Sequence, residues 1–419
     1  MNETIVKIVG TLFEDLDDSA EVRALHDEIL TNCQERYADN IEAGMSEDDA
    51  IHDVMENLRG MEDLLKDYPH KSEAVSEEPK AWTCDPAAAG IDKIHLAHLG
   101  GASVRIFPSG DGLIHAECSP AAATLVTSVS GGVLSIALTD EKPDHLPVTG
   151  ADFSDLRTLF SRLCKRLSDV LEPVTLSLSI PKNLHAALEI EAERGDVEAC
   201  NLTVSKLNVA SSSGDMKLSE IIAEGDAILT TASGDQKVHR LQAQTLEACA
   251  ASGDIEMANL TLERLKANTA SGDMELGDVC AKKEIAFNTA SGDVSLRDTC
   301  SASVKINSAS GDIEAEDIAV TESLSLTSSH GDIRMSGTAS NLFLRTASGD
   351  ISAAVSGQTL TEMRCESNSG DVNVHLPAGL KAVILGHSRT GDCRILSASD
   401  PSAEATVELI TNSGDITVR

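Results

Sequence analysis

Aromatic and basic residues are scarce in this sequence of 419 residues. It contains one Trp, two Tyr and six Phe, whereas carbohydrate clefts and single-strand stacking surfaces usually require more flat rings. Lys and Arg number 33 against 68 Asp and Glu, which gives a formal net charge of −35. No nucleic-acid partner is expected, because neutralising phosphates requires clustered Lys and Arg. The same charge argues against docking of the main body on an anionic membrane.

Long apolar runs and a cysteine framework are also missing. No stretch approaches the ~18 apolar residues of a membrane span, and ten Cys without a C-x-x-C pair are too few for a disulfide scaffold. The first residues, MNETIVKIVG, lack the basic and apolar regions of a signal peptide. We expect a cytoplasmic protein, with peripheral membrane contact left open. The alternative is a cell-surface protein exported by a route that the sequence does not display.

From residue 195 onward the dipeptide Gly-Asp recurs in a regular series of twelve copies. The steps between successive copies range from 18 to 23 residues, and Ser or Thr usually precedes the Gly. The aspartates of this turn ladder are Asp196, Asp215, Asp235, Asp254, Asp273, Asp293, Asp312, Asp332, Asp350, Asp371, Asp392 and Asp415. Such a period is typical of stacked units that share one continuous core.

The residues on either side of each Gly-Asp pair alternate between apolar and polar. Met216 and Leu218 follow Asp215, for example, and equivalent pairs flank the other copies. A period of two is the signature of a strand, so each repeat predicts a strand, a tight corner, a second strand and a further bend. The predicted fold is mainly β: a single-stranded parallel β-solenoid of about twelve regular rungs, right-handed as such crossovers usually are. Degenerate opening rungs are expected over 91–138.

The N-terminal residues 1–70 show helical periodicity and are strongly acidic. The first predicted helix carries Ile5, Val9, Leu12 and Leu16; the second, from Asp18 to Gly44, carries Val22, Leu25, Ile29 and Cys33; the third, from Ser46 to Gly60, carries Ile51, Val54, Met55 and Leu58. We expect an acidic three-helix module that docks a protein partner, a linker over 71–90, and the solenoid over 91–419.

A further amphipathic helix is predicted over 152–171, where it interrupts the strand pattern. Its apolar side carries Phe153, Leu156, Phe160, Leu163 and Leu167. The helix either caps the apolar end of the first rung, as solenoids require, or lies on a membrane surface. We favour the cap, because acidic residues dilute the basic face of the helix.

The repeats resemble a known family. The Ser-Gly-Asp rungs, together with the lead-in Leu178–Lys182, resemble the bacterial putative-adhesin family of β-strand repeats over about 91–419. This resemblance implies a parallel β-solenoid. The segment Tyr37–Ile51 resembles the α-helical signalling domain associated with helix-turn-helix regulators.

The turn ladder invites a metal-binding interpretation. Each rung supplies one carboxylate, whereas Ca²⁺ requires about 6–8 oxygen ligands, so Ca²⁺ is only a minor alternative and no cofactor is expected. The favoured interpretation is structural: Gly supplies a positive φ at the corner, and Asp accepts a local backbone N–H. The integrin-type tripeptide Arg194-Gly195-Asp196 is interpreted as one more corner.

Cysteine and histidine offer two other candidate sites. Cys280 and Cys300 each follow their ladder Asp by seven residues and should therefore stack. We favour buried thiols over a disulfide there. His95 and His98, with Cys84 and Cys118, could suggest zinc, but a spacing of three places the two His on opposite faces of a strand.

The function expected from the sequence is non-catalytic. No rung gathers the carboxylates or basic groups that a polysaccharide-active solenoid would need. The chain is expected to be an interaction scaffold; the alternatives are an exported surface adhesin and, third, a polysaccharide-active enzyme. The chain ends inside a strand at Gly414–Arg419, which predicts an open edge and self-association through the C-terminal rungs.

Overall fold

The computed structural model describes residues 20–42, 81–119, 124–139 and 174–419. It also describes the single positions Ile5, Val9, Phe13, Met45, Ala50, Ile51, Asp53, Val54 and Leu58. The chain divides into two compact units, Met1–Glu77 and Glu78–Arg419. Within these described residues, no helix has the length and apolar character needed to cross a membrane.

The N-terminal unit contains the helix α2 (Ala20–Glu42), which corresponds to the second predicted helix. Its apolar residues pack into a small core, formed by Ile5, Val9, Phe13, Ile29, Cys33, Val54 and Leu58. Arg36 of α2 forms an ion pair with Asp53 at 2.7 Å, and the Asn40 side chain donates to the same carboxylate. Most of the first and third predicted helices lies outside the described residues.

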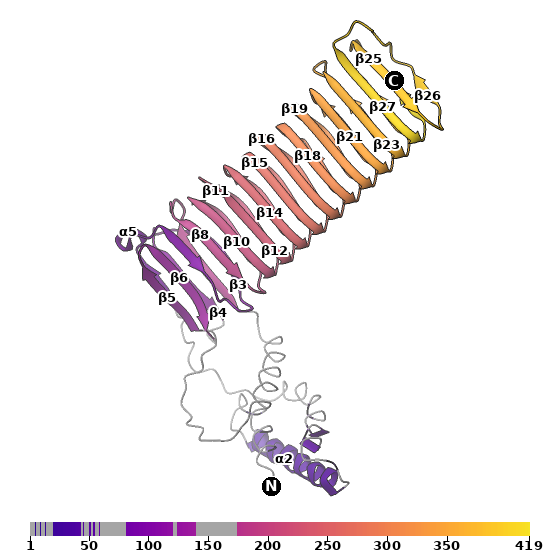
Figure 1. Cartoon of the computed structure of the whole chain (residues 1–419). Helices are drawn as coiled ribbons and strands as arrows, with labels where there is room; N and C mark the ends of the chain where they lie inside the picture. The colour runs from indigo at the N-terminus through magenta and orange to yellow at the C-terminus, as the bar shows by residue number, and fades with distance from the viewer. Residues whose placement is uncertain are drawn as a thin grey trace. The chain divides into compact units, whose positions relative to one another are not determined.

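The second unit is a stack of strands (Figure 1). It opens with β1 (Trp82–Cys84), the short helix α5 (Pro86–Ala89), β2 (Lys93–Leu96), β3 (Ser103–Ser109), β4 (Ile114–Ser119), β5 (Thr124–Ser130), β6 (Val133–Thr139) and β7 (Thr175–Pro181). The regular rungs comprise β8 (Ala187–Ala192), β9 (Val197–Val204), β10 (Lys206–Ser213), β11 (Met216–Ala223), β12 (Ala227–Ser233), β13 (Gln236–Gln242), β14 (Thr245–Ser252), β15 (Ile255–Ser271), β16 (Met274–Ser291), β17 (Val294–Arg297), β18 (Cys300–Ser310), β19 (Ile313–His330), β20 (Ile333–Thr338), β21 (Asn341–Ser348), β22 (Ile351–Val355), β23 (Glu362–Ser369) and β24 (Val372–His375). The last strands are β25 (Ala382–Ser388), β26 (Cys393–Ile395), β27 (Ala405–Ser413) and β28 (Ile416–Val418).

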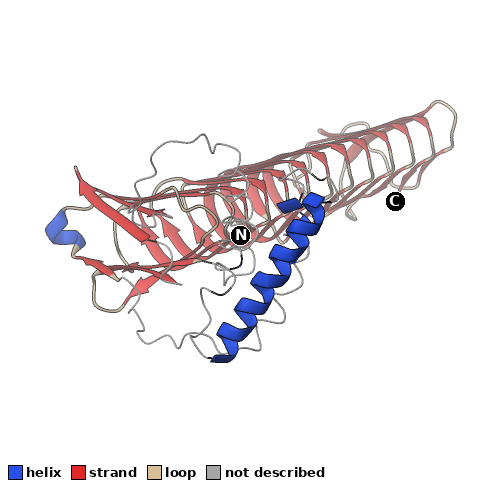
Figure 2. Ribbon diagram, turned by 90° about the horizontal axis from the view of Figure 1, so that it is seen from below, coloured by secondary structure: helices blue, strands red, loops and turns tan. Residues whose placement is uncertain are grey.

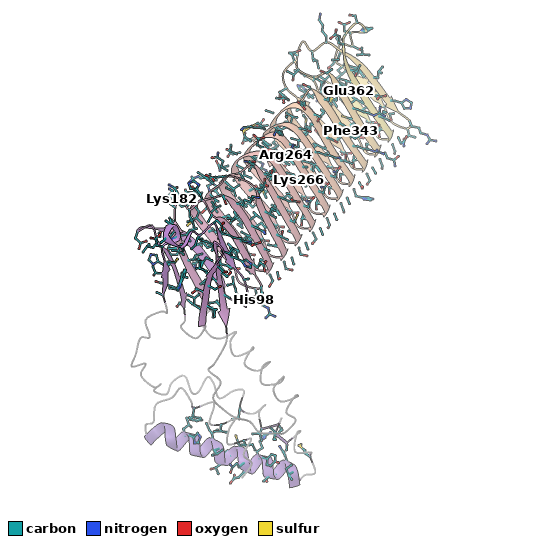
Figure 3. The ribbon with its side chains drawn as sticks, turned by 60° about the vertical axis from the view of Figure 1, so that its left-hand side comes forward. His98, Lys182, Arg264, Lys266, Phe343 and Glu362 are labelled. Atoms are coloured by element: carbon teal, nitrogen blue, oxygen red, sulfur yellow. A yellow bond between two sulfur atoms is a disulfide. The ribbon has the colours of Figure 1, made fainter. Side chains whose placement is uncertain are left out.

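Successive rungs pair in parallel and in register, as the period of the sequence predicted. Leu207 lies beside Ala227, and Ala227 lies beside Leu246 in the next rung. Figure 2 shows the strands stacked along the unit. Because the register is maintained, inward-facing residues form continuous apolar columns through this stack. Outward columns, which include Lys266 and Phe343, line its surface (Figure 3). The β-solenoid prediction is confirmed.

The opening strands depart from a purely parallel coil. β6 and β7 pair in parallel outside β2 and β3, although they follow them in the chain. β5 then pairs antiparallel with β6, β4 pairs antiparallel with β7, and β1 pairs antiparallel with β4. The described part of this end therefore finishes in antiparallel strands. The predicted helix 152–171, with Phe153, Leu156, Phe160, Leu163 and Leu167, lies outside the described residues.

The C-terminal strands are not the last in the stack, which corrects a prediction. β27 pairs with β23 on one side and with β25 on the other, and β28 lies between β24 and β26. The final segment of the chain is therefore enclosed between two earlier rungs. The open edge expected at Gly414–Arg419 belongs instead to β25 and β26; Leu385 on β25 is 57% exposed, and Leu396, directly after β26, is 72% exposed.

Candidate functional site

The turn ladder is built from bonds between rungs. The backbone N–H of each ladder Asp after Asp196 donates to Oδ1 of the Asp in a neighbouring rung; for Asp293 and Asp273 the distance is 2.8 Å. The same bond recurs along the whole ladder at 2.8–3.0 Å. The structure thus places all twelve aspartates in one row, including Asp196 of the Arg194-Gly195-Asp196 tripeptide. The sequence predicted that each Asp carboxylate accepts from a backbone N–H of its own corner. The carboxylate accepts instead from the Asp N–H of the adjacent rung, because the corner directs that N–H along the stack.

The residues around each ladder Asp complete the same corner. In five of the rungs a Ser or Thr three residues before the Gly donates its hydroxyl to the Gly carbonyl of the neighbouring rung; Thr346 bonds to Gly331 O and Ser367 to Gly349 O at 3.0 and 3.1 Å. The Gly N–H donates along the stack as well, as Gly272 does to Ser291 O at 3.1 Å. The repeated motif is therefore a hydrogen-bonding device that joins the rungs.

Replacement of Asp273 tests this role. In Asp273→Ala the amide of Asp293 loses its acceptor, and we expect the protein to lose about 1 kcal/mol of stability and that amide to lose hydrogen-exchange protection. Asp273→Asn retains an acceptor oxygen and should keep the protection. Equal loss in both variants would show that the charge of Asp273, rather than its acceptor, stabilises the corner.

A second bend, which the sequence predicted without its details, lies five residues after the ladder aspartates from Asp196 to Asp332. Seven non-glycine residues there adopt positive φ: Asn201, Glu220, Arg240, Asn259, Asp278, Asp298 and Asp317, with φ between 49° and 58°. Asn and Asp tolerate this left-handed conformation better than other side chains. Their recurrence at this offset is the sequence signal that could have located the bend.

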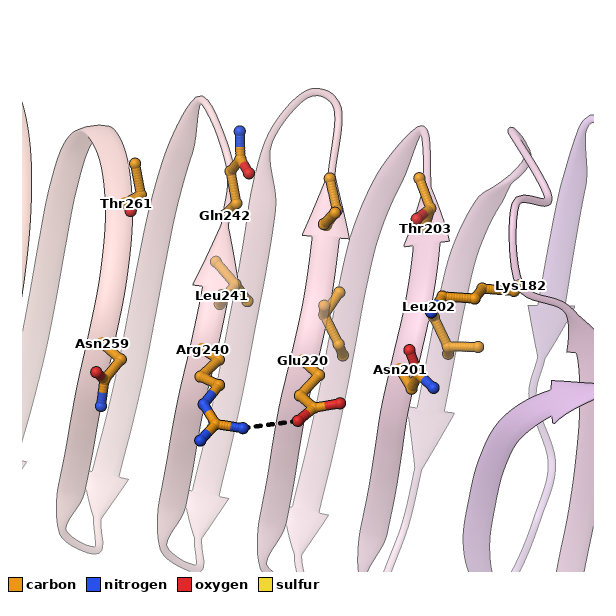
Figure 4. A pocket seen from close by; sticks show the side chains of 12 residues that line it. Lys182, Asn201, Leu202, Thr203, Glu220, Arg240, Leu241, Gln242, Asn259 and Thr261 are labelled. Carbon is orange, nitrogen blue, oxygen red and sulfur yellow. Dashed lines mark hydrogen bonds and ion pairs between the residues drawn. The ribbon is translucent and has the colours of Figure 1, made fainter.

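A shallow groove of about 360 Å³ follows this second bend over four rungs (Figure 4). One wall is the column Asn201, Glu220, Arg240 and Asn259, and the other is the outward column Thr203, Ile222, Gln242 and Thr261. Glu220 and Arg240 form an ion pair at 2.7 Å across adjacent rungs. Ile222 is 43% exposed among polar neighbours. The Lys182 side chain lies at one end of the groove and has no carboxylate partner among the described residues.

A smaller hollow of about 200 Å³ lies beside the turn ladder, with Asp254, Asp273 and Glu275 in its lining. Lys237 also lines it and forms an ion pair with Glu256 at 2.8 Å, which raises the pKa of Lys237. The ladder carboxylates already accept backbone N–H groups. Within the described residues, no three His, Cys, Asp or Glu side chains are grouped so as to hold a metal ion.

The shifted carboxyl groups are all displaced in one direction. Hydrogen bonding to Lys93 lowers the pKa of Glu189, and hydrogen bonding to Lys283 lowers that of Glu263. Hydrogen bonding to His115 likewise lowers the pKa of Asp111. A general acid of a glycoside-cleaving site requires the opposite shift.

The cysteine prediction was wrong in one place. Cys280 and Cys300 stack as expected but form a disulfide, with Cα atoms 4.8 Å apart. Cys280 is exposed and Cys300 is half-buried, because both belong to an outward column rather than to the core. The zinc candidates are spread over three opening segments: Cys84 on β1, His95 on β2 with His98 after it, and Cys118 on β4.

Comparisons with known proteins were made for the whole chain. No curated protein matches the sequence. The fold is similar to a crystal structure titled "Putative lipid binding protein" from Parabacteroides distasonis ATCC 8503, with 18% identity over 71% of this chain and 97% of that chain. The TM-score of 0.32 is too low for an inference about function.

The family comparison corrects the assignment suggested by the repeats. A model described as Toastrack DUF4097 matches residues 91–279 and 246–419. The predicted membership of the adhesin-repeat family is therefore wrong, although the solenoid that it implied is present. The matches begin at residue 91 and lend no support to a signalling domain at Tyr37–Ile51. Because the matched segments cover most of the solenoid unit and more than half of the protein, the chain belongs to the Toastrack DUF4097 family.

Proposed function

We propose that the protein is a non-catalytic interaction scaffold whose solenoid binds a partner protein along the groove of the second bend. The observation that carries this proposal is that three residues that differ from the repeat pattern lie together in the groove. Glu220 and Arg240 occupy positive-φ positions that Asn or Asp fill in five other rungs, and Ile222 adds an exposed apolar side chain beside them. Backbone strain of this kind, about 1 kcal/mol or more per residue, is concentrated at functional sites.

The rest of the repeat supports a scaffold role. The Asp carboxylate and the Gly backbone N–H of the corner bond to neighbouring rungs along the ladder, so the repeated chemistry is structural. Binding specificity then comes from the outward columns, which vary from rung to rung. A groove with Ile222 at its centre and, at one end, the ammonium of Lys182, which has no carboxylate partner in the described part of the chain, fits a peptide segment that presents an apolar side chain and a carboxylate. Docking through the N-terminal unit stays a prediction.

Site-specific photo-crosslinking in cells tests the groove. A photoreactive phenylalanine analogue at position 222 should give one discrete protein adduct. The matched control is position 228, where Ile228 is 41% exposed on another face one rung away. Arg240→Glu should reduce the adduct at 222 by roughly fivefold or more, since a loss of about 1 kcal/mol weakens binding by that factor. Equal adducts at 222 and 228, or no adduct at 222, would refute the proposal.

A further inference from the structure

The strand β5 leaves a full row of backbone groups without partners among the described residues. On its neighbour β6, Ile136 O accepts from Ala97 N, and Leu138 N donates to His98 O. The backbone N–H and C=O groups of the even-numbered residues of β6 therefore point toward β2. The backbone N–H and C=O groups of its odd-numbered residues point the other way, toward β5.

The antiparallel register then decides which groups of β5 are free. Leu125, Thr127 and Val129 lie opposite even-numbered residues of β6. Their N–H and C=O groups consequently point away from β6. Within the described part of the chain, no other strand pairs with β5.

The side chains of β5 do not protect this edge. The segment TLVTSVS carries no charged residue and no Pro, and Val126 and Val129 are 44% and 42% exposed. Proteins normally blunt exposed edge strands with charge, Pro, bulges or a covering loop. In a chain of net charge −35, an uncharged edge is the kind of surface on which two copies can meet with least repulsion.

The opposite end of the stack is covered in part. The loop after β26 covers the start of β25: Asp400 N donates to Ala382 O at 2.9 Å, and Ser399 Oγ accepts from Ile384 N at 3.0 Å. Antiparallel pairing of two β25 strands about Leu385 would also set Lys381 opposite Arg389 of the second copy. Like charges directly opposite each other destabilise a strand pair.

We propose that two copies of the chain form a two-fold dimer through antiparallel pairing of their β5 strands. With Thr127 on the two-fold axis, Leu125 faces Val129 of the second copy and Val126 faces Ser128 of the second copy. The outward N–H and C=O groups of Leu125, Thr127 and Val129 then bond across the interface. Such a self-complementary interface closes after two subunits, and it is independent of the groove.

Sedimentation velocity of the full chain tests the dimer. The wild type should sediment as a dimer at tens of micromolar, and more strongly at 0.5 M than at 0.1 M salt because repulsion between the acidic copies is screened. Thr127→Pro removes the central outward N–H without touching a bond to β6, and Val126→Lys places like charges at the interface. Each should weaken dimerisation by roughly tenfold or more.

Two controls identify the interface. Ile228→Lys changes an equally exposed residue on a strand that is paired on both sides and should leave the dimer intact, as should Leu385→Lys on β25. Thermal unfolding of each variant shows that the solenoid is folded. A monomeric wild type, an assembly larger than two copies, or dissociation by Leu385→Lys but not by Val126→Lys would overturn the proposal.

Discussion

Replacing Gly272 with Ala should unfold the middle of the solenoid. Gly272 has a φ of +153°, and a Cβ at this position would lie 2.1 Å from the carbonyl oxygen of Gly253 in the neighbouring rung. The neighbouring atom is backbone, so it cannot rotate away. Relief requires the two rungs to separate, which breaks the ladder bonds on both sides. We expect a loss of about 3–5 kcal/mol from overpacking and backbone strain together.

The same chain contains a matched control. Gly277 lies five residues later on β16, and a Cβ there would meet no atom within 4 Å. Gly277→Ala should therefore leave stability nearly unchanged or raise it slightly, because Ala restricts the unfolded chain. Chemical denaturation measures both variants.

Hydrogen exchange locates the damage that Gly272→Ala causes. Repeat proteins can unfold in part, because each rung contacts only its neighbours. Loss of protection should be greatest in the rungs that contain Asp254, Asp273 and Asp293. If Gly272→Ala and Gly277→Ala behaved alike, the close approach of the corners would not limit the choice of residue.

Truncation of Phe287 should be the most damaging change in the apolar core. Phe287 is fully buried, and in its inward column it lies between Ala267 and Ile306. The small side chain of Ala267 provides the volume that the ring fills. Phe287→Ala therefore leaves a cavity that the rigid ladder cannot close, and we expect a loss of about 3–5 kcal/mol.

Two further variants make this result interpretable. Phe343→Ala removes the same atoms from a half-buried position in an outward column (Figure 3) and should cost roughly 1 kcal/mol or less. Phe287→Leu retains most of the volume and should cost about 1 kcal/mol. Similar losses for Phe287→Ala and Phe343→Ala in chemical denaturation would mean that the core around Phe287 collapses to fill the space.

The strands were predictable because a period of two fixes which side chains face the core. Leu207 and Val209 alternate with polar residues in one rung, and the structure buries both. The corner was predictable because Gly-Asp recurs with the period of a rung. Spacing identifies stacked residues but not the bonds between them. The partner of each Asp carboxylate, and the Cys280–Cys300 disulfide, were therefore misjudged.

The groove was not predictable in the same way. Its walls bring together residues from four rungs, and only the five-residue offset of Asn201 and Asn259 from their ladder aspartates signalled the bend. The departures from the repeat at Glu220 and Arg240 are recognised as one grouped feature when the columns are compared in space. An ion pair between residues twenty positions apart depends on the rung length, which the neighbouring rungs set.

The sequence by itself determined the repeating rung: its two strands, its Gly-Asp corner and the apolar columns of its interior. These follow from local alternation and from turn residues, which act over a few positions. The tertiary structure alone decided the order of the final rungs. Gly386 stands in the inward column beside Leu409, and Cys393 Sγ lies 2.5 Å from where a Cβ of Gly386 would be, so this rung is filled differently from the regular ones. The regular segment Ala405–Val418 fills the enclosed position, and the irregular rung that contains Gly386 lies at the end, where no neighbour has to pack against it.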